Sequence, residues 1–252
     1  IPFDSSFIIY TNHIIIKNMK KTLLSLFAIS LSSAAMAQQP EVGKFSIIPR
    51  IGVSIANLND DILVYDNLDC TLSSRYRTGF MGGADIEYQA LPNLSVSLGA
   101  YYMQQGCNYK NSFVSNSATK GTGTGYSDLT TQLHYLQVPL MANIYIAPGV
   151  AIKAGLQMGF AMSGKMELTT TDYTENKEGE ITPSTPKEES YNLNSTMKKV
   201  NFSIPVGFSY EFANVVLDAR YNIGLTPIQQ VLDYKGPKNK VFTVSVGYRF
   251  TL

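Results

Sequence analysis

The sequence is poor in charge, cysteine and histidine. Asp, Glu, Lys and Arg make up 15% of its 252 residues, against about 25% in ordinary soluble domains, so something other than charge must cover its surface. The formal net charge is only +1, and the absence of a basic patch argues against nucleic acid as a partner. Only two residues are histidines, His13 and His134. This excludes a metal centre built from several histidines, and we expect no cofactor.

Long apolar runs are also missing. A membrane-spanning helix needs roughly 18 consecutive apolar residues, and no segment beyond residue 37 approaches that length. If this part of the chain enters a membrane, it must therefore do so as strands.

The N-terminal region predicts export. Lys20 and Lys21 precede "TLLSLFAISLSSAAMA", which has the short apolar region and small-residue cleavage site of a signal peptide. We expect a signal peptide at residues 19–37, with cleavage after Ala37 and no lipid attachment, because no cysteine follows. Residues 1–18 precede Met19, and we interpret them as a mis-set start outside the fold. Residues 38–252 are then one domain.

Eight segments alternate apolar and polar residues with the period of two that is typical of half-buried strands. No helical period of comparable length interrupts them. They cover residues 45–55, 80–89, 94–102, 136–146, 152–160, 201–211, 215–225 and 240–252.

The connections between these segments are of two alternating kinds. "ALPN", "APGV" and "EFAN" are tight turns, whereas the other connections run for roughly 14 to 36 residues, well beyond ordinary hairpin loops. We expect residues 110–128 and 163–199 to be long loops, with the renewed alternation at Met166 to Leu168 extending a hairpin above the membrane. Short periplasmic turns and long extracellular loops are typical of outer-membrane barrels.

The predicted fold is therefore all-β: an eight-stranded antiparallel up-and-down transmembrane β-barrel. The last segment runs to the end of the sequence, and it must pair with the first, because lipid offers no partner to an open strand edge. A soluble barrel would show the same alternation with its faces reversed. The polar face decides between them, because it carries mainly Gly, Ser, Asn and Gln, which suit a narrow interior.

Eight charged residues of both signs share that polar face. We expect them to pair inside the lumen and lock the barrel, although a ligand site or proton path would use the same groups. An interior of eight strands is just wide enough for side chains, so no conducting pore is expected. The eight residues are Arg50, Asp85, Glu87, Lys153, Glu211, Asp218, Arg220 and Arg249.

Two further sites are candidates for chemistry. His134 lies near Ser127 and Asp128 in sequence, so a Ser/His/Asp hydrolase site at the rim of the barrel is one hypothesis. A histidine at the rim without a catalytic role is the simpler interpretation. Cys70 and Cys107 fall in or beside neighbouring long loops. A disulfide between them and two separate thiols both fit an exported protein.

Three stretches carry a family resemblance: "YLQVPLMANIYI" at 135–146, "FSIPVGFSYEF" at 202–212 and the terminal "VSVGYRF". With the signal peptide, they resemble the PorT-like outer-membrane β-barrel domain common in Bacteroidetes. The resemblance implies an outer-membrane location and a final strand that the barrel-insertion machinery reads. One class of such proteins is tied to protein secretion.

We therefore expect a non-enzymatic, porin-like monomer in the cell envelope, in contact with outer-membrane lipid and lipopolysaccharide. Its extracellular loops would serve surface interaction, envelope integrity or assistance to a secretion system, through a surface or secretion-system protein partner. The alternatives are an outer-membrane hydrolase or acyl-modifying enzyme centred on His134, and a transporter of a small hydrophobic compound.

Overall fold

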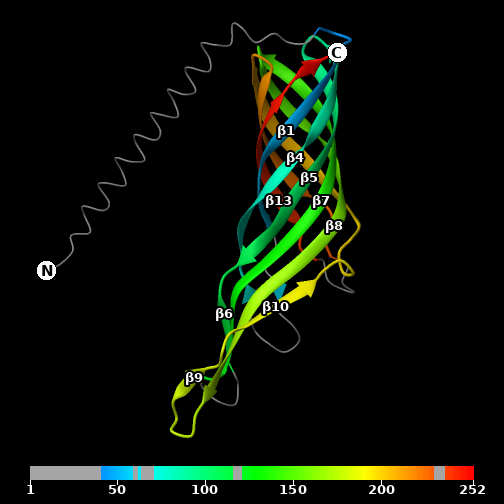
Figure 1. Cartoon of the computed structure of the whole chain (residues 1–252). Helices are drawn as coiled ribbons and strands as arrows, with labels where there is room; N and C mark the ends of the chain where they lie inside the picture. The colour runs from blue at the N-terminus through cyan, green and yellow to red at the C-terminus, as the bar shows by residue number, and fades with distance from the viewer. Residues whose placement is uncertain (1–40, 59–61, 64–70, 116–120, 230–235) are drawn as a thin grey trace, which may run out of the picture.

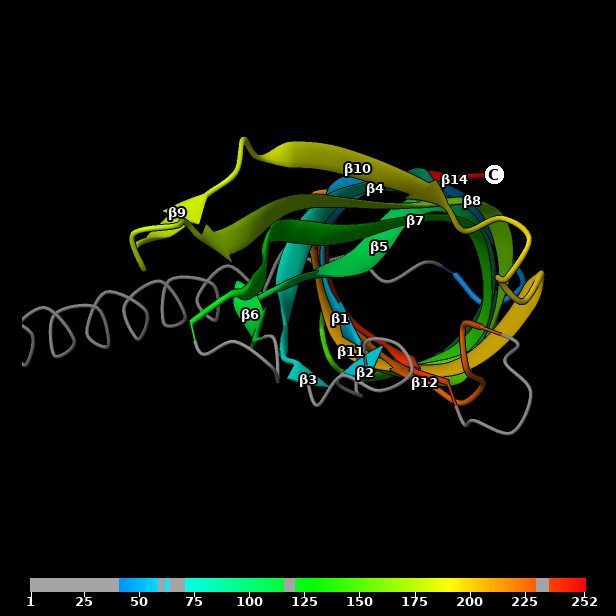
Figure 2. The same cartoon turned by 90° about the horizontal axis from the view of Figure 1, so that it is seen from below.

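The computed structural model describes residues 41–58, 62–63, 71–115, 121–229 and 236–252. The predicted signal peptide and the segment before it lie outside these ranges. Eight long antiparallel strands form a ring around a lumen (Figure 2). They are β1 (Phe45–Leu58), β4 (Ser74–Leu91), β5 (Leu94–Tyr109), β7 (Gly123–Ala147), β8 (Val150–Glu175), β11 (Val200–Phe212), β12 (Val215–Gly224) and β13 (Asn239–Tyr248), which β14 (Phe250–Thr251) continues.

The ring closes where the last strand pairs with the first. β13 pairs with β1, with Val246 opposite Ile51, and β14 continues this pairing with Thr251 opposite Ser46. β7 and β8 pair over most of their length and complete the circle. The predicted pairing of the last strand with the first is therefore confirmed, and it satisfies the backbone groups that an open edge would leave in lipid.

Short turns gather at one end of the barrel. β11 and β12 are joined by Ala213 and Asn214, whose φ angles of 48° and 67° are left-handed, and Gly149 (φ 73°) serves the turn between β7 and β8. The C-terminus lies at the same end, at the top of Figure 1. The long connections lie at the opposite end, as predicted for an outer-membrane barrel.

The outer face of the barrel is an apolar belt. Leu156 and Phe208 are 65% and 60% exposed. On β8 the belt runs from Ile152 to Met162, about 33 Å along the strand at a rise of 3.3 Å per residue. At a tilt of about 40° this spans roughly 25 Å, the height of the apolar band of such barrels.

Aromatic rings cluster near the short-turn end of the belt. Phe45 lies 4.8 Å from Tyr88, and Tyr248 lies 4.8 Å from Phe250, measured between ring centroids. Rings at this level resemble an interfacial girdle. Among the described residues, no helix has the length and apolarity to cross a bilayer.

The two expected long loops are largely strands, and that part of the prediction is wrong. β7 and β8 continue far beyond the belt and are flanked by β6 (Ser112–Ser115) on one side and by β9 (Ile181–Pro183) and β10 (Lys187–Asn192) on the other. We call β6, β9, β10 and the outer parts of β7 (residues 123–130) and β8 (residues 167–175) the extracellular arm. It projects beyond the ring to one side (Figures 1 and 2).

The arm forms because cross-strand pairing needs no apolar face. Each added rung satisfies backbone donors and acceptors on both strands, and the β-branched run Thr169 to Thr171 favours extended backbone. The predicted extension of the hairpin at Met166 to Leu168 is confirmed. A small separate hairpin, β2 (Ile62–Leu63) with β3 (Thr71–Leu72), lies in the first long connection.

Candidate functional site: a filled lumen and an extracellular groove

The structure places all eight predicted charged residues inside the barrel, and each is at most 6% exposed. Four are cations and four are carboxylates, so the formal charges of the set cancel. They form two groups. The first contains Arg50, Asp85, Lys153, Asp218 and Arg220, and the second contains Glu87, Glu211 and Arg249.

Asp218 is the centre of the first group. Its carboxylate accepts hydrogen bonds from Arg220 Nε at 2.6 Å and from Lys153 Nζ at 2.9 Å, and Arg50 Nη1 lies 3.3 Å away. Asp85 accepts from Arg50 Nε at 2.8 Å and from Arg220 Nη2 at 3.2 Å. Two carboxylates thus hold three cations that come from β1, β8 and β12.

Arg249 organises the second group. Its Nε donates to Glu211 at 2.7 Å, and its Nη2 donates to Glu87 at 3.1 Å. Glu87 also accepts from the Tyr145 hydroxyl at 2.8 Å and from Asn143 Nδ2 at 3.2 Å. Because the partners sit on β4, β7, β11 and the segment after β13, this network ties together strands from around the ring.

Amide side chains form the next layer of the lumen, towards the extracellular end. They surround a cavity of about 20 Å³, which is space for about one water molecule. The amide residues that line it are Gln105, Gln137, Gln157, Asn201, Asn222 and Asn239.

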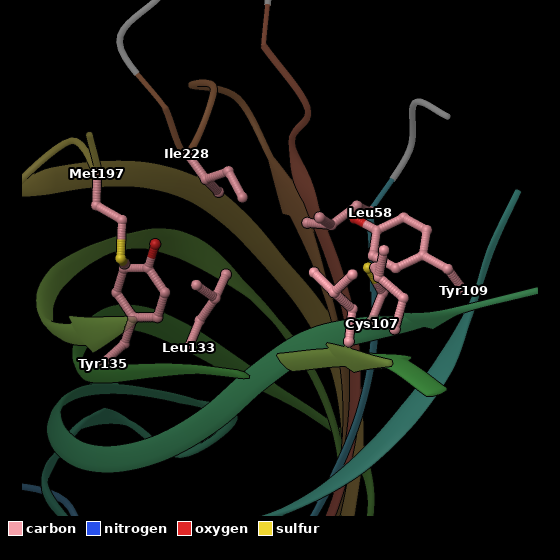
Figure 3. Close-up of a cluster of buried hydrophobic side chains, with 9 residues drawn as sticks. Leu58, Cys107, Tyr109, Leu133, Tyr135, Met197 and Ile228 are labelled. Carbon is pink, nitrogen blue, oxygen red and sulfur yellow. The ribbon is translucent and has the colours of Figure 1, made fainter. Parts of the chain in front are cut away.

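An apolar cluster fills the extracellular part of the interior (Figure 3). The cavity against it measures about 10 Å³. Sequence reasoning missed this cluster, because the luminal face was expected to be polar throughout. Its buried members are Leu58, Cys107, Tyr109, Leu129, Leu133, Tyr135, Leu168, Met197 and Ile228.

His134 is not brought together with the residues of the hypothetical hydrolase. Its side chain lies on the outer surface, where Nδ1 is 2.6 Å from the Tyr102 hydroxyl. Asp128 lies six residues away along the same strand, about 20 Å at an extended rise. In the described ranges, no group of three or more His, Cys, Asp and Glu side chains is arranged to hold a metal ion.

The structure describes only one of the two cysteines, Cys107. Cys107 is fully buried in the apolar cluster, beyond the belt, and burial raises the pKa of its thiol to about 11. Cys70 lies outside the described residues. The disulfide between them therefore stays a prediction.

The arm carries a groove that sequence reasoning did not identify. It measures about 320 Å³, far larger than the cavities of about 20 and 10 Å³ inside the barrel. Among the residues that the structure describes, no charged side chain lines it. The composition of these segments did not predict the groove, because their residues are typical of loops. The lining residues are Asn111, Ser112, Phe113, Gly125, Tyr126, Ser127, Thr171 and Tyr173.

A closed ring of strands with an apolar outer belt and a charged, filled lumen defines an integral outer-membrane β-barrel protein. The chain belongs to the family described as outer membrane protein beta-barrel domain, which matches residues 36–230. The protein is located in the bacterial outer membrane.

Several solved structures are similar in fold. The attachment invasion locus protein Ail of Yersinia pestis is 16% identical over 83% of this chain and 100% of its own, with a TM-score of 0.41. Neisserial surface protein A is 13% identical over 82% and 97%, with a TM-score of 0.36. Outer Membrane Protein W of E. coli is 17% identical over 84% and 100%, with a TM-score of 0.35. No curated protein matches the chain significantly.

Proposed function

We propose that this protein is a non-enzymatic outer-membrane anchor that presents its extracellular arm for recognition at the cell surface. One observation carries the proposal. The barrel interior is filled, whereas the arm carries an open groove of about 320 Å³. In this view the eight luminal charges are structural.

The filled lumen opposes transport along the barrel axis. The carboxylate of Asp218 lies 2.9 Å from Lys153 Nζ and 2.6 Å from Arg220 Nε. A compound passing through the lumen would have to separate these groups. Breaking one buried ion pair costs about 3–5 kcal/mol, and here several pairs share partners. A hydrophobic compound has no group that would replace them.

The described residues do not support the enzyme alternative centred on His134. His134 contacts Tyr102 on the outer surface, and its distance from Asp128 rules out a direct hydrogen bond between them. Two alternatives for the partner stay within the proposal: a protein of a secretion system, as the PorT-like resemblance implies, and a component of the cell surface. The exposed arm favours the second. We expect the barrel to act as a monomer surrounded by lipid and lipopolysaccharide.

The test is removal of the arm tip from a barrel that still folds. Asn111 lies opposite Ser127 if the β6–β7 register continues, and Thr169 lies opposite Glu188. Joining each pair through an Asn-Gly turn deletes the tip and keeps the strands below it. Far-UV circular dichroism and heat-dependent migration on gels would verify that the variant is a folded barrel.

Both proteins would be placed in lipid nanodiscs and tested for binding to cell-surface material, namely the outer-membrane fraction and shed polysaccharide of the same bacterium. We expect the full chain to bind and the tip-deleted variant to lose most of that binding. Equal binding by the two proteins, or none by the full chain, would refute the proposal.

A further inference from the structure

We propose that the groove on the extracellular arm is a binding site for a neutral saccharide. This inference rests on the proposed function and names the chemistry of its ligand. Phe113 on β6, Gly125 on β7 and Thr171 on β8 lie opposite one another on three adjacent strands, so their side-chain positions share one face of the arm. Tyr173 follows two residues after Thr171 on the same face.

Gly125 lets the Tyr173 ring lie close over the middle strand of the groove. A Cβ at this position would lie 3.1 Å from Cε2 of the Tyr173 ring, which is tighter than nine in ten real contacts. A larger residue here would therefore have to displace this ring, so the shape of the groove depends on the glycine.

Aromatic rings form the walls. The rings of Phe113 and Tyr173 lie 5.5 Å apart at an interplanar angle of 75°. Phe113 is 47% exposed, although a ring of its size is usually buried. The face of the exposed Phe113 ring is a flat apolar surface of the kind on which the C–H face of a pyranose ring packs.

The polar groups of the lining are all neutral. Asn111, Ser127 and Thr171 supply amide and hydroxyl groups that both donate and accept hydrogen bonds, as the hydroxyls of a sugar require. A sulfated or phosphorylated ligand would need Lys or Arg beside it, and the described lining contains neither. An acyl chain would leave these polar groups unpaired. A neutral saccharide satisfies both the rings and the hydroxyls.

The arm's position offers two sources of such a ligand. Because the groove lies beyond the apolar belt, it faces either the saccharide of lipopolysaccharide in the same leaflet or saccharide from another surface. The chemistry of recognition is the same for both, and the experiment below separates them.

The test uses the full chain in lipid nanodiscs. Binding is measured by calorimetry against maltohexaose, cellohexaose and chitotetraose, against the delipidated saccharide of the same bacterium's lipopolysaccharide, and against a sulfated oligosaccharide. We expect at least one neutral oligosaccharide to bind and the sulfated one not to. Binding of the lipopolysaccharide saccharide alone identifies the same leaflet as the source, and binding of the other oligosaccharides identifies an external one.

Three variants connect binding to the groove. Gly125→Val displaces the Tyr173 ring from its place over the strand, and Phe113→Ala and Tyr173→Ala each remove a wall. Each should weaken binding by roughly tenfold or more, as expected for the removal of a central contact. Asp172→Asn is the matched control. It lies between Thr171 and Tyr173 on the opposite face, where its carboxylate accepts from the Thr124 hydroxyl at 2.7 Å, and it should bind like the parent.

Two results would overturn the inference: no neutral saccharide bound by the full chain, or saccharide binding that Gly125→Val and Tyr173→Ala leave unchanged. If tip-dependent binding to surface material persisted while every saccharide failed, the proposed function would stand and only the nature of the ligand would be wrong. If the full chain bound neither surface material nor any saccharide, both proposals would be wrong.

Discussion

Replacing Asp218 by Asn should destabilise the barrel strongly, because this carboxylate holds three buried cations. In the variant, Arg50 and Arg220 retain Asp85 at 2.8 and 3.2 Å. Lys153 has Asp218 as its ion-pair partner among the described residues, and the substitution would leave its buried ammonium group without one. One broken buried pair costs about 3–5 kcal/mol, and we expect a loss of that size in the free energy of unfolding.

The neighbouring substitutions give this prediction its control. Lys153→Met alone leaves Asp218 with Arg220 and Arg50, so its cost should be clearly smaller than that of Asp218→Asn. The double variant Lys153→Met with Asp218→Asn removes one charge of each sign and keeps the formal sum of the set at zero. It should therefore be more stable than Asp218→Asn alone, with a favourable coupling of at least about 1 kcal/mol.

The assay is equilibrium unfolding in urea, with the proteins folded in lipid vesicles and followed by far-UV circular dichroism. Midpoints are compared only where the slopes agree. A loss below about 1 kcal/mol in Asp218→Asn, or a double variant no more stable than Asp218→Asn, would refute the view that these charges form one paired structural layer.

Three other predictions follow from burial and filling. Leu156→Lys, on the lipid-facing belt, should cost about 2–4 kcal/mol of unfolding free energy; a neutral effect in the same urea assay would contradict the belt. In a Cys70→Ser background, alkylation of Cys107 by iodoacetamide should be very slow at pH 8 and accelerate about tenfold per pH unit towards its pKa of about 11; an ordinary thiol rate at pH 8 would contradict its burial. In planar bilayers the full chain should give no stepwise conductance, and a stable open channel would contradict the filled lumen.

The positions of the eight strands and the closure of the ring follow from the period-two pattern, because lipid imposes both the alternation and the pairing of edges. The eight charged residues were also accessible to sequence reasoning. Lys153 and Asp218 each lie in a segment that alternates apolar and polar residues. Because the apolar face of such a strand contacts lipid, a charged side chain on the other face points into the interior of the barrel.

One member of the apolar cluster in the lumen, Leu168, could not be predicted, because a register shift changes the face on which its side chain lies. Between His134 and Tyr135 the pairing of β7 with β8 skips a residue of β8. An uninterrupted alternation would place Leu168 on the same outer face as Met158, yet the structure buries it. A one-residue bulge moves every later side chain to the other face, and nothing in the composition marks where it occurs.

The arm groove was hidden for a different reason. Its strands are rich in Gly, Ser, Thr and Glu, which are the residues that ordinarily indicate loops. Their pairing depends on the continuation of β7 and β8 out of the barrel. That continuation is a property of the three-dimensional register and cannot be derived from the local sequence.

The orientation of the two strand faces is the central claim, and the absence of tryptophan from the sequence makes it directly measurable. Phe208→Trp places a single indole on the outer belt, where Phe208 is 60% exposed, and Tyr101→Trp places one in the interior, where Tyr101 is 2% exposed. In vesicles of bromine-labelled lipid, fluorescence at position 208 should be strongly quenched and fluorescence at position 101 should not. Equal quenching at both positions, or quenching only at 101, would contradict the account.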